Sequence, residues 1–241
     1  MRPLLAHVRV ELILAARRGE GVLVTLVLPL ALLVFFAGVL PASVAGGNTL
    51  DFLVPGILAL AIVSTSMVSL GIATAFERYY GVLKRLVGSP LPRRILLLGK
   101  TLSILIIELF QATAVIGVAR FAFGWEPKGS LALAGAALLI GSVAFAGIGL
   151  LMAGTLRAEA TLAVANGLYV VFLLLGGFVF PLDRLPPAVA SIARLLPAGA
   201  LADATRVALS GTGQGLLRPF GILAVWAVGA AGAAAITFRA E

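Results

Sequence analysis

The sequence contains no cysteine and a single histidine, and these two scarcities exclude several kinds of site. Without cysteine the chain has no disulfide, no thiolate metal ligand and no cysteine nucleophile. His7 has no second ligand at metal-binding spacing, so a metal site is not expected. No serine lies in a Gly-x-Ser-x-Gly motif, so hydrolase chemistry inside a membrane has no nucleophile to use.

Charged residues are scarce as well. Asp, Glu, Lys and Arg make up 12% of the 241 residues, whereas soluble proteins carry about 25%. Hydrophobic residues make up 61% and the mean hydropathy is +1.13, so the chain has too little polar surface for a water-facing body. We therefore predict an all-α integral membrane protein. The net charge of +8 is distributed between apolar runs, which indicates membrane topology and the lipid bilayer as a partner, not nucleic acid.

Six apolar stretches have the length of about 20 residues that a helix needs to cross a bilayer. They cover residues 22–40, 52–76, 95–123, 131–156, 162–180 and 220–238. We predict one transmembrane domain over residues 1–241, with six transmembrane helices. No internal repeat is evident, so the sequence gives no support to a carrier built from inverted repeats.

Residues 1–20 do not form a signal peptide, because charged residues interrupt any apolar core. One helical face carries the apolar residues Leu5, Val8, Leu12 and Ala15, and another carries His7, Glu11 and Arg18. This division predicts an amphipathic helix in the membrane interface, and a plain charged extension is the alternative. Most Lys and Arg residues lie on the side of the N-terminus, so we predict an inner-membrane protein with both termini in the cytoplasm.

Residues 181–215, between the fifth and sixth stretches, are too polar to span a bilayer and too apolar for a free loop. Pro186 and Pro187 can begin a short helix, which we expect to end at Pro197. A second short helix over about 201–209 would carry Asp203 and Arg206 as a surface ion pair. We predict that both short helices form an extracellular re-entrant segment in the outer leaflet.

A basic segment, YYGVLKRLVGSPLPRRILLLGKT, runs from residue 79 to 101 between the second and third stretches. Its last three residues match the end of a phosphate-binding loop. Such a loop also needs a glycine at position 94, where this chain has Arg94, and a strand before it. We interpret the match as incidental and expect no cofactor site in this chain. Lys100 is better explained as a positive residue at the cytoplasmic interface.

The same segment predicts a docking helix. Val82, Leu83 and Leu86 share roughly one helical face, and Lys84 and Arg85 point elsewhere. Glu77 and Arg78 end the second stretch and precede this helix. An amphipathic helix at this place can insert its apolar face into a groove on a cytoplasmic protein.

Glu108 lies near the middle of the third stretch, and Gln111 follows one helical turn later. A charged carboxylate at bilayer depth costs about 2.5–3.5 kcal/mol on insertion scales, so Glu108 should face protein or water. Two interpretations stay open. The residue is either a polar contact or proton-linked site in a transport pathway, or a hydrogen-bonded group that ties this helix to another.

Three segments resemble one family in order along the chain: FLVPGILAL, FERYYGVLKRLVGSPLPRRILLLGK and FPLDRLPPAVASIARLLPAGALADATRVAL. With the basic helix at the N-terminus, they make the chain similar to ABC-2 type permeases, the membrane subunits of ATP-binding-cassette exporters, in particular short drug-efflux permeases. The resemblance implies that residues 77–94 form a coupling segment that docks on a separate ATPase subunit. Its docking residues would be Glu77, Arg78, Val82, Leu83, Lys84, Arg85 and Leu86.

The resemblance further implies a dimer with a second permease copy, identical or not, and ATP and Mg²⁺ bound to the ATPase subunits. The chain would be non-catalytic and would export its cargo by ATP-driven alternating access. The apolar stretches favour a hydrophobic or amphipathic cargo, such as a drug-like compound or a lipid. Two alternatives stay open: a proton-coupled secondary carrier that uses Glu108, and a non-transporting membrane anchor for a cytoplasmic partner.

Overall fold

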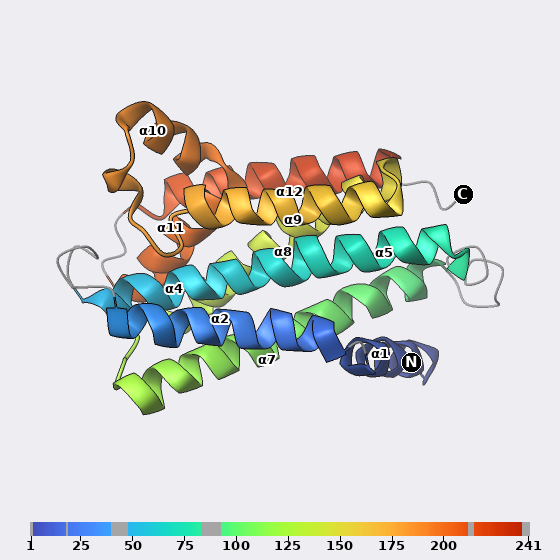
Figure 1. Ribbon diagram of the computed structural model, residues 1–241, viewed down its shortest axis with the longest axis horizontal. Coiled ribbons are helices and arrows are strands. Elements are labelled where there is room, and N and C mark those ends of the chain that lie inside the picture. Colours follow the sequence, from blue (N-terminus) through green and yellow to red (C-terminus); the bar gives the residue numbers. More distant parts are fainter. Residues whose placement is uncertain (1, 18, 40–47, 83–92, 212–214, 238–241) are drawn as a thin grey trace.

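A computed structural model describes residues 2–17, 19–39, 48–82, 93–211 and 215–237, and the statements below concern these residues. The described part is helical and contains no strand. A bundle runs along the long axis in Figure 1. Its helices are α2 (Gly19–Val39), α4 (Thr49–Ile62) continued through η1 (Val63–Ser69) and α5 (Leu70–Tyr79), α7 (Arg93–Phe123), α8 (Leu131–Thr155), α9 (Ala158–Leu175) and α12 (Leu217–Thr237). The predicted all-α membrane fold is confirmed.

Five helices of the described part are long and apolar enough to cross a membrane: Thr49–Tyr79, Gly99–Phe123, Leu131–Thr155, Ala158–Leu175 and Leu217–Thr237. Within α2, residues Leu26–Val39 form a shorter apolar helix. Consecutive members of the bundle run in opposite directions, so α1 (Arg2–Arg17) and the end of α12 lie at one end of the bundle (Figure 1). We call this the α1 end. A sixth span in α2 stays a prediction, as does the cytoplasmic location of the α1 end.

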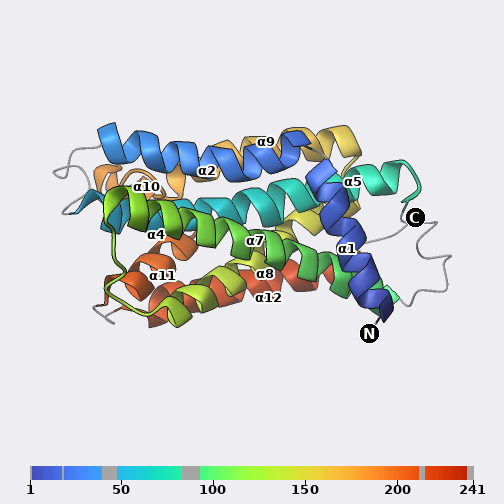
Figure 2. The same cartoon turned by 90° about the horizontal axis from the view of Figure 1, so that it is seen from below.

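Helix α1 crosses the α1 end at a steep angle to the bundle, as Figure 2 shows. This orientation suits a helix in a membrane interface, and the interfacial location of α1 stays a prediction. His7 and Glu11 lie inward with Val8, against α7, while Leu5, Ile13 and other apolar residues face outward. The docking is close, because a side chain at Gly99 of α7 would overlap the His7 ring.

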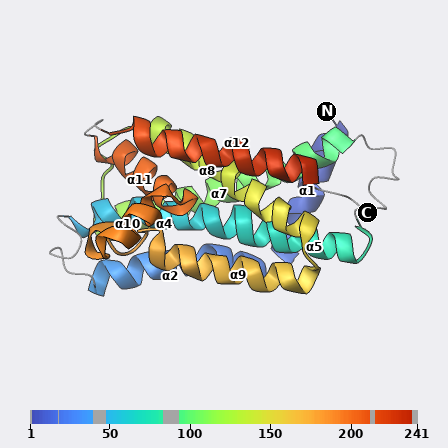
Figure 3. The same cartoon turned by 90° about the horizontal axis from the view of Figure 1, so that it is seen from above.

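The opposite end, here called the α11 end, carries the short helices α10 (Pro187–Leu195) and α11 (Pro197–Ser210), which follow the single turn η2 (Leu182–Arg184) (Figure 3). Helix α10 begins after Pro186, as expected. Helix α11 begins at Pro197, four residues earlier than expected, because proline fits the first position of a helix. The placement of this region in the outer leaflet stays a prediction.

The helix α4–η1–α5 forms the centre of the bundle. In Figures 2 and 3 it lies between α2 with α9 on one side and α8 with α12 on the other. Its residues 53–67 are buried without interruption. At its α5 end Gly71 approaches Gly149 of α8 so closely that a Cβ on Gly71 would lie 3.1 Å from the Gly149 Cα. Small residues permit this packing.

Candidate functional site

Polar side chains gather at three levels of the bundle: at the α1 end, halfway along it, and at the α11 end. At the α1 end the key residue is Arg78, in the last turn of α5. Its guanidinium donates one hydrogen bond to the Leu156 carbonyl at 2.6 Å and another to the Gly154 carbonyl. These carbonyls lie at the C-terminus of α8, where helical partners are missing and the helix dipole favours a cation. Arg78 thus joins α5 to the corner between α8 and α9.

Glu77 and Lys100 form an ion pair at the same end. The pair joins the end of α5 to the first part of α7, and the two side chains are only 12% and 17% exposed. The two helices flank the predicted coupling segment 77–94, so its two ends are fixed to each other. Lys100 was predicted as an interfacial anchor, and the structure gives it this specific acidic partner.

The docking surface itself is described only in part. Gly81 takes a left-handed conformation, with φ of 68°, and ends the long helix. Val82, Tyr79 and Tyr80 are exposed there, and the two tyrosine rings meet edge to face at 5.1 Å. Leu83, Lys84, Arg85 and Leu86 lie outside the described residues. The role of the seven predicted docking residues therefore stays a prediction.

Halfway along the bundle, Glu108 and Gln111 of α7 are almost fully buried. The Glu108 carboxyl group accepts hydrogen bonds from Ser66 of η1 and from Ser142 of α8. The Gln111 Oε1 atom accepts a hydrogen bond from the Thr65 hydroxyl of η1 at 2.9 Å. Glu108 is thus a hydrogen-bonded group that connects α7 to η1 and α8, as in the second of the two interpretations given above.

Arg206 of α11 is the centre of the polar contacts at the α11 end. Its guanidinium donates hydrogen bonds to the carbonyl of Gly177, just after α9, and to that of Phe52 in α4 at 3.4 Å. It also lies over the Phe52 ring, 3.9 Å from the ring centre, and contacts Asp203 at 3.5 Å. One side chain therefore joins α11 to α4 and to the segment after α9.

The prediction of Asp203 and Arg206 as a surface pair is wrong, because the Arg206 side chain is only 17% exposed. Burial lowers the pKa of Arg206 to about 10, so the group is still a cation at neutral pH. Burial also raises the pKa of Asp203, and the neighbouring Arg206 opposes that change. The i,i+3 spacing indicated that the two residues are in contact. It did not indicate that Arg206 also bonds to backbone carbonyls of other segments.

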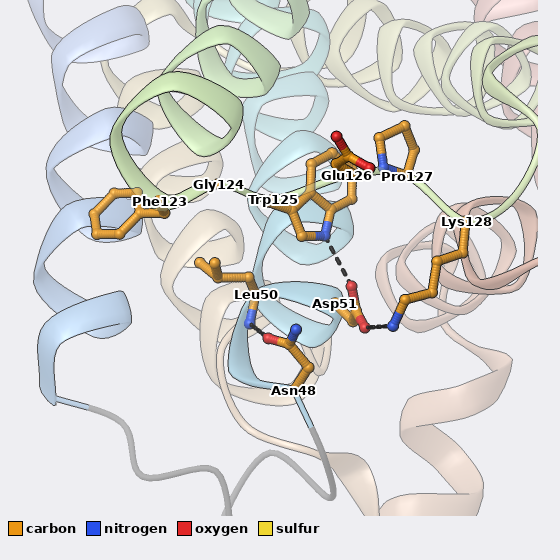
Figure 4. A pocket seen from close by; sticks show the side chains of 9 residues that line it. All are labelled: Asn48, Leu50, Asp51, Phe123, Gly124, Trp125, Glu126, Pro127 and Lys128. Atoms are coloured by element: carbon orange, nitrogen blue, oxygen red, sulfur yellow. Dashed lines mark hydrogen bonds and ion pairs between the residues drawn. The ribbon is translucent and has the colours of Figure 1, made fainter.

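A cavity of about 340 Å³ opens beside these contacts, between the start of α4 and the loop from α7 to α8 (Figure 4). Within it Asp51 accepts hydrogen bonds from Trp125 Nε1 at 2.9 Å and from Lys128 Nζ at 2.5 Å. The amide of Gly129 in this loop donates to the Leu209 carbonyl at 2.9 Å and so caps α11. Sequence patterns gave no signal for this site, since its residues come from separate segments.

The helical bundle, its buried polar ties and its short helices at one end define a multi-pass membrane protein. Residues 4–209 match the family described as ABC-2 type transporter, and the chain belongs to that family. Among its relatives, the "Probable multidrug ABC transporter permease YbhR" of Escherichia coli (strain K12) is 28% identical over 156 residues. That match covers 64% of this chain and 42% of YbhR, so the chain spans less than half of that relative.

A second relative matches along most of its length. The "Putative transport permease YvfS" of Bacillus subtilis (strain 168) is 27% identical over 190 residues, which is 75% of this chain and 75% of YvfS. The similarity to the ABC-2 family that the sequence motifs indicated is thereby confirmed.

Proposed function

We propose that this chain is the membrane permease subunit of an ATP-binding-cassette exporter that moves a hydrophobic or amphipathic cargo, drug-like or lipid, out of the cell. The observation that carries the proposal is the family match over residues 4–209. The printed names of YbhR and YvfS, a multidrug ABC transporter permease and a transport permease, support it. In this proposal the chain has no cofactor of its own, and a separate ATPase subunit binds ATP and Mg²⁺.

The contacts at the α1 end support a mechanical role for the coupling segment. The segment follows directly on the central helix α4–η1–α5. The Glu77–Lys100 pair connects it to α7, and Arg78 connects it to the end of α8. A displacement of the segment by a cytoplasmic partner would therefore act directly on α5 and, through these contacts, on α7 and the end of α8. In the proposed cycle, nucleotide binding brings two ATPases together and pushes the coupling segments of two permease copies.

The ATPase can shift the permease between inward-open and outward-open forms only by as much as it binds the two forms differently. In this proposal the α11 end closes the outer side of the pathway, with both chain termini in the cytoplasm and the bundle in the inner membrane. Two alternatives make different demands. A proton-coupled carrier requires that Glu108 bind and release a proton, and a membrane anchor requires only a partner bound at the α1 end.

We expect the double substitution Leu83→Asp/Leu86→Asp to reduce the amount of co-purified ATPase subunit at least tenfold, because two charges would enter the proposed apolar docking face. Insertion into the membrane should be unchanged. The measurement is affinity purification of the assembled complex, with the ATPase band quantified against the permease.

A matched control is available on the other end of the molecule. Ile192 and Leu195 have the same spacing on a short amphipathic helix and are exposed. The substitution Ile192→Asp/Leu195→Asp should leave the ATPase bound. Full retention of the ATPase by the Leu83/Leu86 variant would contradict the assigned docking site. An ATPase that stays bound but never responds to any cargo would favour the anchor.

A further inference from the structure

The central helix of the bundle is not α-helical throughout. Between α4 and α5, residues Val63–Ser69 form a π-helical turn, in which the Leu70 amide is directed at the Thr65 carbonyl five residues earlier. Such a turn accommodates one extra residue, is rare, and occurs often at functional sites. Its residues 63–67 belong to the longest run of buried residues in the described part of the chain.

Two hydroxyl groups on this turn bond to another helix. Serine and threonine in a helix commonly donate to the carbonyl four residues earlier. Elsewhere in this bundle Thr113 of α7 and Thr155 of α8 do so, at 2.8 and 2.7 Å. Thr65 and Ser66 instead donate away from their own helix, to the side chains of Gln111 and Glu108 on α7.

The other side of the turn lies against α8. A Cβ on Gly149 would be 2.7 Å from the Met67 carbonyl oxygen and 3.1 Å from that of Ser66. Only glycine leaves room there for the widened backbone of η1. The π-turn is thus held by two side-chain acceptors of α7 and fits against a glycine of α8.

We propose that Glu108 and Gln111 are positioning residues that hold the π-turn η1, and that conversion of this turn to a regular α-helix re-orients α5 against α8. An α-helix advances about 100° and 1.5 Å per residue, so absorbing the extra residue would turn and shift α5 by about these amounts. Helix α5 carries Glu77 and Arg78 at the base of the coupling segment. With the turn converted, α5 could move with the coupling segment while α4, on the α11 side of the turn, keeps its position. This consequence rests on the proposed function.

The chain has no cysteine, so cysteine pairs introduced into it are the only thiols present. Ala75 of α5 and Ala153 of α8 pack in one buried cluster, beyond η1 on the α1 side. The full-length Ala75→Cys/Ala153→Cys chain in lipid nanodiscs, treated with a short bifunctional thiol reagent, reports how α5 faces α8. The Asp51→Cys/Lys128→Cys pair, on the other side of η1, replaces an existing contact and serves as reference.

The expected result is a loss of cross-linking in the Ala75/Ala153 pair when the acceptors are removed. Glu108→Ala/Gln111→Ala should lower its yield at least threefold, because the π-turn then loses both of its side-chain bonds to α7. The milder Thr65→Val/Ser66→Ala, which removes the donors with little change of volume, should do the same. Neither should change the yield of the reference pair.

Two further variants separate positioning from other roles. Glu108→Gln keeps one acceptor and one donor at the same place, so the yield should fall less than threefold, whereas a proton carrier would lose its function. Ser142→Ala removes only the hydrogen bond from α8 to Glu108, so the cross-linking yield should again fall less than threefold.

An unchanged cross-linking yield in Thr65→Val/Ser66→Ala overturns the proposal. A yield in Glu108→Gln as low as that in Glu108→Ala/Gln111→Ala overturns it as well. Absence of cross-linking in the parent pair also overturns it, since α5 would then not face α8. The measurement uses neither ATPase nor cargo. Failure of the proposed exporter function, seen as no ATPase bound to the wild-type chain, is therefore a separate outcome.

Discussion

Replacing Arg206 by methionine should lower the free energy of unfolding by about 3 kcal/mol, the scale observed when one partner of a buried charged contact is removed. Methionine fills much of the volume but donates no hydrogen bond. The carbonyls of Gly177 and Phe52 would lose their donor, and Asp203 would lose its cation. Equilibrium unfolding of the purified chain in mixed detergent micelles, with increasing denaturing detergent, measures this difference.

Two variants make the result specific. Arg206→Lys keeps the charge but not the planar fork of donors, so it should recover only part of the loss. Arg194→Met is the matched control, because Arg194 also lies in a short helix of the α11 end and pairs with Asp183, with side chains 41% and 78% exposed. An exposed pair contributes about 0–1 kcal/mol. Equal effects of Arg206→Met and Arg194→Met would refute the central role given to Arg206.

Gly56→Ala should destabilise the protein by about 3 kcal/mol, at the upper end of the usual cost of overpacking a core. Gly56 lies in α4, and its added Cβ would overlap the carbonyl oxygen of Phe178 in the segment after α9. That oxygen belongs to backbone, so no side-chain rotation relieves the clash. The same carbonyl also lies 3.5 Å from the Arg206 guanidinium. The substitution should therefore loosen the same region as Arg206→Met.

Gly117→Ala provides the matched control for this prediction. Gly117 is a helical glycine of α7, and a Cβ there would meet no atom within 4 Å. Alanine is favoured over glycine in a helix interior by about 0.5–1 kcal/mol, so this variant should be as stable as the parent or slightly more stable. The same unfolding titration compares the two. A Gly56→Ala chain as stable as Gly117→Ala would contradict the close approach of α4 to Phe178.

The positions of the helices followed from the sequence because lipid leaves the backbone few alternatives. The apolar stretches at 131–156 and 220–238 differ from α8 and α12 by a few residues at most. The proline rules also located α10 correctly. These are local signals, and each depends on residues close together in the chain.

The features that the sequence did not predict depend on distant partners. The π-turn is bonded to acceptors 42 and 46 residues away, and nothing in its own composition marks it. Arg206 has one carbonyl partner 154 residues away, so its spacing to Asp203 suggested only a surface pair. Helix α1 faces the bundle with His7 because Gly99 leaves room for the ring, which no pattern within residues 1–20 could reveal.

The central helix is covered by the other helices, which affects how the protein responds to the thickness of the membrane. In the apolar 18-residue stretch of Thr49–Tyr79, 89% of the residues are buried inside the protein. The same share is 22% in α9 and 22% in α12. Hydrophobic mismatch acts on the surfaces that acyl chains touch. A thicker or thinner bilayer would therefore act first on the exposed helices, α9 and α12 among them, and would reach the central helix through its neighbours.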